Sequence, residues 1–94
     1  MKKFQSPFGE VELTDEREKH ILQFHPEIRL YRKHLPSTIE NPDTIRRSKS
    51  DQKVVILYHS IPTKKQYLAV VIKMNRRNFI LTAYLTNKLK TPKL

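Results

Sequence analysis

The fold is decided by residues 54–86, which read VVILYHSIPTKKQYLAVVIKMNRRNFILTAYLT. This stretch holds three runs rich in β-branched and aromatic residues, separated by a loop that contains Pro62 and by a short polar turn. The turn begins and ends with Asn75 and Asn78, and asparagine tolerates the left-handed backbone of a tight hairpin. Connections this short join neighbouring strands that run antiparallel to each other. With one more extended run upstream, the sequence predicts four antiparallel strands, at residues 44–48, 54–60, 67–74 and 79–86.

The residues before this sheet have mainly helical features. Val11 and Leu13 alternate with glutamates, which indicates a short half-buried strand. Thr14 then offers N-cap chemistry ahead of an acidic first turn, and a helix is expected over about residues 15–25. Pro26 disfavours helical geometry at the residue before it and therefore ends this helix.

A second helical segment is expected at about residues 28–40, where apolar side chains recur every four residues. Pro36 lies inside it and removes a backbone donor, so we expect a broken or late-starting helix. The predicted fold is therefore a single α+β domain over residues 1–94. A short N-terminal strand and two helices (helical part about 14–41) would pack on one face of a four-stranded antiparallel meander (about 44–87), followed by a loose tail at 91–94.

Charge is distributed unevenly along the chain, which carries a formal net charge of +10. Residues 1–43 hold seven basic and eight acidic side chains, whereas residues 44–94 hold twelve basic side chains and one acid, Asp51. Clustered positive charge is typical of surfaces that bind nucleic acids, because neutralising phosphates releases counterions. A basic surface that is merely solvated is the other interpretation.

The composition excludes several classes of function. The chain has no cysteine, so disulfides, thiolate catalysis and cysteine-ligated metals are absent. Gly9 is the only glycine, which excludes glycine-rich phosphate-binding loops. No apolar run approaches the ~20 residues of a membrane span. We therefore expect a cytoplasmic protein without a membrane contact.

Strand periodicity assigns side chains to the two faces of the predicted sheet. In the last strand, Phe79, Leu81, Ala83 and Leu85 are expected to face the core under the helices. The opposite face then gathers hydroxyls, phenols and an ammonium group, from Tyr67, Lys73, Thr82, Tyr84 and Thr86. Such a face can bind phosphate oxygens and stack bases, although threonine and tyrosine are also common on ordinary solvated strands.

A series of short motifs also occurs in a characteristic order. The series comprises His20, Phe24–Glu27, Thr38–Asp43 with Ile45 and Ser48, Leu57-Tyr58, Tyr67–Lys73 and Phe79–Thr86. In order and spacing it resembles the phage-associated barnase–EndoU–colicin–RelE-like nuclease domains over about residues 9–90. The resemblance implies helices followed by a four-stranded antiparallel sheet, and a metal-independent ribonuclease used as a toxin or in phage conflict. Pro36 departs from the pattern expected for the second helix.

Metal-independent RNA cleavage needs a base for the 2′-hydroxyl, an acid for the leaving 5′ oxygen and positive charge near the phosphorane. The resemblance places a motif histidine at His20. Tyr84 could donate a proton or bind phosphate, and Lys73 could stabilise charge, with hydroxyl ligands from Thr82 and Thr86. The expected substrate-binding residues are His25, Arg46, Arg47, Ser48, Tyr58, Tyr67, Arg76, Arg77 and Lys88. No metal ligand and no cofactor are expected, and His34 and His59, outside the motifs, are expected at the surface.

Three alternatives stay open at this point. Asp43 and Asp51 lie in a short match to the carboxylate motif of magnesium-dependent nucleases. A non-catalytic RNA- or nucleic-acid-binding module would use the same basic, aromatic sheet face. An interaction protein would dock other chains through its acidic and basic halves. The expected partners are RNA, whether free, ribosomal or transfer RNA, and an acidic antitoxin or immunity protein attracted by the basic half.

Overall fold

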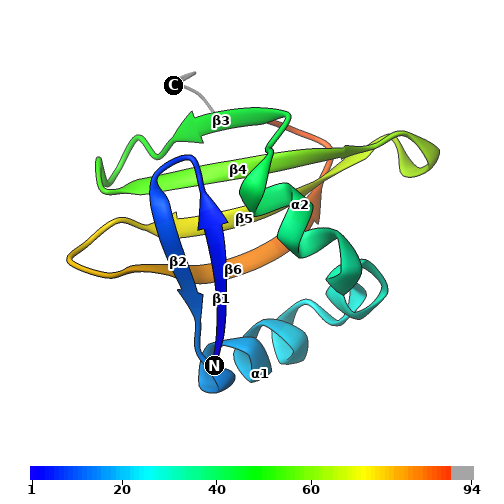
Figure 1. Ribbon diagram of the computed structural model, residues 1–94. Helices are drawn as coiled ribbons and strands as arrows, with labels where there is room; N and C mark the ends of the chain where they lie inside the picture. Colours follow the sequence, from blue (N-terminus) through cyan, green and yellow to red (C-terminus); the bar gives the residue numbers. More distant parts are fainter. Residues whose placement is uncertain (90–94) are drawn as a thin grey trace.

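The structure, a computed structural model, describes residues 1–89, so the predicted tail at 91–94 lies outside it. The described residues form an α+β fold with one mixed sheet, in the strand order β1-β2-β6-β5-β4-β3 (Figure 1). In chain order the elements are β1 (Lys2–Ser6), β2 (Gly9–Leu13), α1 (Asp15–Phe24), the 3₁₀ helix η1 (Pro26–His34), α2 (Leu35–Glu40), β3 (Thr44–Arg47), β4 (Val54–Ile61), the short 3₁₀ helix η2 (Pro62–Lys64), β5 (Gln66–Lys73) and β6 (Asn78–Thr86).

The four strands β3 to β6 form the predicted antiparallel meander, and each lies within one or two residues of its predicted bounds. The predicted four-stranded sheet is nevertheless wrong as a whole, because two further strands make it six-stranded and mixed. β1 pairs with β2 in an antiparallel hairpin. β2 pairs with β6 in parallel at two positions, Val11 with Asn78 and Glu12 with Phe79.

β1 was missed because only one of its faces is covered. Its two lysines and Gln5 are exposed, which leaves Phe4 as its one apolar side chain against the core. The turn after β1 is stabilised by the hydroxyl of Ser6, which accepts a hydrogen bond from the Phe8 amide. Gly9 follows with φ of +105°, a backbone region that favours glycine.

The helical segments agree with their predicted limits. Thr14 caps α1 by accepting a hydrogen bond from the amide of Arg17, and α1 ends at Phe24, two residues before Pro26. The second helical segment is broken, as expected, into η1 and α2. Pro36 lies in the first turn of α2, where its missing donor would have no helical partner. None of the helices within residues 1–89 is both long and apolar enough to cross a membrane.

A single apolar layer joins the helices, the hairpin and the inner face of the sheet. Figure 1 shows α2 and the β1–β2 hairpin on the same side of β3 to β6, while α1 packs against β6 and η1. The buried core consists of Val11, Leu13, Ile21, Ile28, Leu35, Ile39, Val55, Leu57, Ile61, Leu68, Val70, Ile72, Ile80 and Ala83.

The predicted core face of β6 is wrong at one end. The register between β5 and β6 shifts after Val71, so that Ile80 rather than Leu81 lies opposite Ile72 and enters the core. Phe79 then lies opposite Lys73, on the other face of the sheet. Strict alternation fails here because a bulge adds one residue to β6 and reverses the faces beyond it.

Candidate nucleic-acid interface

The face of the sheet opposite the helices carries its own small cluster of apolar and aromatic side chains. Tyr58, Ala69 and Tyr84 lie side by side on β4, β5 and β6. Tyr58 and Ala69 are fully buried. The surrounding cover comes from Tyr67, Val71, Tyr84 and Leu89. The centre of this face, which we call the open face, is therefore an aromatic patch rather than a wet surface.

The strand register places the five side chains predicted for this face on the same side of the sheet. Tyr67 lies opposite Thr86, and Thr82 and Tyr84 follow on the same face of β6. Tyr67 also contacts Tyr58 edge-on, with ring centroids 6.0 Å apart. Lys73 lies at the other end of the same face of β5.

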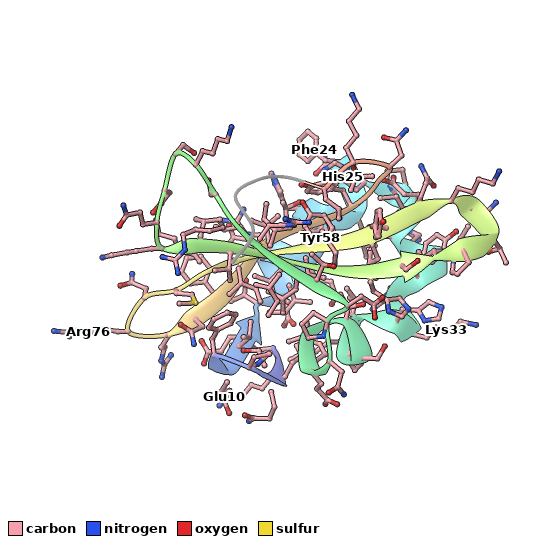
Figure 2. The ribbon with its side chains drawn as sticks, turned by 90° about the horizontal axis from the view of Figure 1, so that it is seen from above. Glu10, Phe24, His25, Lys33, Tyr58 and Arg76 are labelled. Atoms are coloured by element: carbon pink, nitrogen blue, oxygen red, sulfur yellow. The ribbon has the colours of Figure 1, made fainter. Side chains whose placement is uncertain are left out.

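His25 reaches this face from the helical side. It follows the last residue of α1, and its ring lies 5.8 Å from the ring of Tyr84. Its Nδ1 atom lies 3.7 Å from a carboxylate oxygen of Glu27. Figure 2 shows Phe24 and His25 on the same side of the sheet as Tyr58. His25, which the sequence predicts to bind substrate, therefore contacts Tyr84, the predicted proton donor.

The environment of Tyr84 keeps its hydroxyl protonated. Burial raises the pKa of Tyr84 above its ordinary value of 10.0, and the nearby Tyr58 adds to the effect. A phenol of this kind can donate a proton or a hydrogen bond throughout the physiological pH range.

His20 lies elsewhere on α1. Its side chain is exposed, and its ring contacts Phe24 at 4.6 Å between centroids. The predicted catalytic histidine therefore contacts Phe24, whereas the ring that contacts Tyr84 is that of His25.

A cavity of about 560 Å³ opens beside Tyr84. Its other walls come from the β3–β4 loop and from the segment after β6, with lining residues Ser48, Lys49, Ser50, Tyr84, Thr86, Lys88 and Leu89. The hydroxyl of Thr86 exchanges hydrogen bonds of 3.2 Å with the amide and the carbonyl of Lys88, which turns this segment over the face. The cavity thus combines two ammonium groups with hydroxyls, the donors that bind phosphate oxygens.

Lys73 is engaged by the β3–β4 loop. Its ammonium group pairs with the carboxylate of Asp51, whose other oxygen accepts a hydrogen bond from the amide of Lys53. The hydrogen bond from Lys73 is the largest of the contacts that lower the pKa of Asp51, so the carboxylate stays ionised. Lys73 is therefore already paired, and its contact holds the loop over the open face.

The two neighbouring arginines of β3 point to opposite faces. Arg46 lies opposite Ile56 on the open face, whereas Arg47 lies opposite Val55 on the core side and donates to the carbonyl of Gln52. Within residues 1–89, the buried Nε of Arg46 has no hydrogen-bond partner. Arg46 thus brings a guanidinium to this face with one buried donor that no described residue satisfies.

The other predicted substrate-binding arginines lie far from Tyr84. Arg76 and Arg77 occupy the β5–β6 turn, about 20 Å along β6 from Tyr84 at ~3.3 Å per residue. Arg77 lies 3.9 Å from Glu12, and Arg76 projects at the far end of the hairpin (Figure 2).

A pair of stacked histidines was missed by the sequence reasoning. His34 and His59 are partly buried rather than at the surface, and their rings stack at 5.6 Å between η1 and β4. The Nδ1 atom of His59 lies 3.5 Å from Asp43. The two residues are 25 positions apart, so neither spacing nor periodicity could indicate the contact.

The two aspartates of the magnesium alternative lie apart. Asp43 precedes β3 and accepts a hydrogen bond from the amide of Ser60, whereas Asp51 follows β3 and pairs with Lys73. Residues 1–89 contain no group of three histidine, aspartate or glutamate side chains placed to hold a metal ion.

Comparison of the chain with protein-family models, with curated proteins and with solved structures gives no match. The resemblance to the barnase–EndoU–colicin–RelE-like nucleases therefore stays a prediction.

Proposed function

We propose that the protein is an endoribonuclease that cleaves RNA without a metal ion, by attack of the 2′-hydroxyl on the adjacent phosphate. The observation that carries this proposal is the 5.8 Å contact between His25 and Tyr84 at the wall of a cavity that also holds Lys49 and Lys88. A titratable imidazole, a protonated phenol and phosphate-binding cations are the groups that this reaction needs.

In the proposed reaction His25 acts as the base and Tyr84 as the acid. The imidazole takes the 2′-hydroxyl proton, and the 2′ oxygen forms a bond to phosphorus. The bond from phosphorus to the 5′ oxygen breaks, and Tyr84 gives its proton to that oxygen. The products are a 2′,3′-cyclic phosphate and a free 5′-hydroxyl. The carboxylate of Glu27 lies beside Nδ1 of this imidazole, where it can orient the ring.

The proposal assigns charge stabilisation to Arg46 instead of Lys73. Asp51 already neutralises Lys73, whereas Nε of Arg46 has no hydrogen-bond partner among the described residues. Arg46 and Tyr84 stand on strands three spacings apart, about 14 Å between backbones, and both side chains are long enough to reach a phosphate between them. A guanidinium offers that phosphate a planar pair of donors.

The test is cleavage of labelled mixed-sequence RNA by purified protein in excess EDTA. Wild type should release products that end in 2′,3′-cyclic phosphate. His25→Ala and Tyr84→Phe should each lower the rate about 10²- to 10⁴-fold, the range for loss of a general acid or base. Tyr31→Phe, which removes a phenol from η1, is the matched control and should cleave as wild type does.

His20→Ala is the discriminating variant, because the resemblance implies that His20 is the base. If His20→Ala loses cleavage while His25→Ala keeps it, the proposed base is wrong. Products that carry a 5′-phosphate, or cleavage only after magnesium is added, would contradict the whole mechanism.

A non-catalytic RNA-binding module is the second candidate. It is favoured by the Lys73–Asp51 pair, which neutralises the cation that the motif pattern assigns to charge stabilisation. In that case RNA binds with a steep dependence on salt and stays intact in the same assay.

A further inference from the structure

Phe24 is unusually exposed for its size and position. It is the last residue of α1, and 62% of its surface is accessible. Isolated exposed hydrophobic residues are common on protein surfaces, so the exposure alone indicates nothing. Its location beside the proposed reaction site is the informative observation.

The ring of Phe24 is held in place by the end of α1. The amide of the next residue, His25, donates a 2.7 Å hydrogen bond to the carbonyl of Ile21, which fixes the last helical turn. His20 packs on the ring at 4.6 Å, one turn earlier on the same helix. The end of α1 therefore presents an exposed aromatic ring that is in contact with one neighbouring ring.

Phe24 adjoins the proposed reaction site through the next residue in the chain, His25. His25 contacts Tyr84, and Tyr84 lines the cavity with Lys49 and Lys88. Phe24 and His25 lie on the same side of the sheet in Figure 2. A strand that places a phosphate in the cavity would therefore bring a neighbouring base toward Phe24.

We propose that Phe24 is a base-stacking residue that makes the protein select single-stranded RNA over duplex RNA. Stacking on an aromatic side chain is favourable for every base, but it requires a base that is not already stacked and paired in a helix. The excess of positive charge after residue 43 favours a polyanion over an apolar protein segment as the ligand. The inference rests on the RNA-binding part of the proposed function and deepens it.

Binding of a fluorescent, 2′-O-methylated oligonucleotide tests the inference without cleavage, as a single strand and as a duplex. Phe24→Ala should weaken single-strand binding about 5- to 150-fold and leave duplex binding unchanged. Phe24→Tyr should bind as wild type, because the aromatic ring is kept. Leu30→Ala is the matched control, since Leu30 is 76% exposed on η1 and should have no effect.

The outcomes separate this inference from the proposed function. Wild-type affinity of Phe24→Ala for single strands would overturn the stacking role, while normal wild-type cleavage would leave the ribonuclease proposal intact. Equal loss of single-strand and duplex binding would overturn the selection. If wild type neither binds nor cleaves RNA, both proposals fail. If Phe24→Ala binds RNA as wild type does but no longer binds a protein that wild type binds, Phe24 belongs to a protein interface and the stacking role is wrong.

Discussion

Ile72 on β5 lies directly opposite Ile80 on β6, although the preceding residue Val71 lies opposite Thr82. The pairing leaves Leu81 as the extra residue of a bulge. Ile80 is 2% exposed in the core, whereas Leu81 is only partly buried. The bulge therefore determines which of two neighbouring apolar residues stabilises the fold.

Truncation of these two residues should have unequal effects. We expect Ile80→Ala to lower the free energy of unfolding by about 2–5 kcal/mol, the range for a buried aliphatic side chain in a core. Leu81→Ala should lower the free energy of unfolding by less than half as much. Urea denaturation of both variants measures the difference, and equal losses would contradict the bulge.

The loop between β3 and β4 should open when its contact with Lys73 is removed. Asp51→Asn keeps the side-chain shape but weakens the charge-assisted hydrogen bond, so residues 48–53 should be freed. A protease specific for lysine should then cleave faster after Lys49 and Lys53. Cleavage after Lys64, in another loop, is the internal control and should not change.

The same ion pair has a definite dependence on pH. The pKa of Asp51 is lowered in the folded protein, so its stabilising effect is present above the ordinary value of 3.8 and is lost as pH falls through the lower folded value. Wild type should therefore approach the protease sensitivity of Asp51→Asn only in strong acid.

Tyr84 should make the protein less stable at alkaline pH. Its pKa is raised by burial, so above about pH 10 the unfolded chain releases the phenolic proton before the folded protein does. The free energy of unfolding should decline less steeply between pH 9 and 11 in Tyr84→Phe than in wild type. Tyr31→Phe controls for loss of a phenol outside the open face. A steeper decline in Tyr84→Phe would contradict the raised pKa.

Arg76 should contribute to affinity for RNA but not to the chemistry. It lies at the tip of the β5–β6 hairpin, far from His25 in Figure 2 and at the opposite end of β6 from Tyr84. Arg76→Ala should reduce the slope of log affinity against log salt by about 0.7, the value for one phosphate contact to a single strand. The cleavage rate of the bound complex should be unchanged. Lys33→Ala, on the helical side, should leave the slope as it is.

The sequence predicted those parts of the fold that have strong local signals. The four meander strands, the cap at Thr14 and the break caused by Pro36 were all correct. The strand β1 was not predicted, because one apolar residue, Phe4, among exposed polar ones gives almost no periodic signal. The bulge in β6 depends on pairing with β5 and leaves no trace in a single strand.

The candidate site was predictable as a face but not as a set of contacts. Alternation placed Tyr67, Thr82, Tyr84 and Thr86 together, because the strand period is independent of the partner. The approach of His25 to Tyr84 depends on the path of α1 along β6, which no local pattern encodes. Similarly, the pairing of Lys73 with Asp51 depends on how the β3–β4 loop folds back.

The side chain of Asn78, at the start of β6, donates to the carbonyl of Phe8, 70 residues earlier in the chain. Together with the parallel pairing of β2 and β6, this contact means that the first hairpin has no neighbour in the sheet until the last strand is made. Bringing β2 and β6 together is slow, because the conformational entropy of the chain between them is lost before their contacts form. During synthesis on a ribosome the core therefore stays open until β6 emerges. The open face, which β6 shares with β4 and β5, would therefore form only after all six described strands have been synthesised.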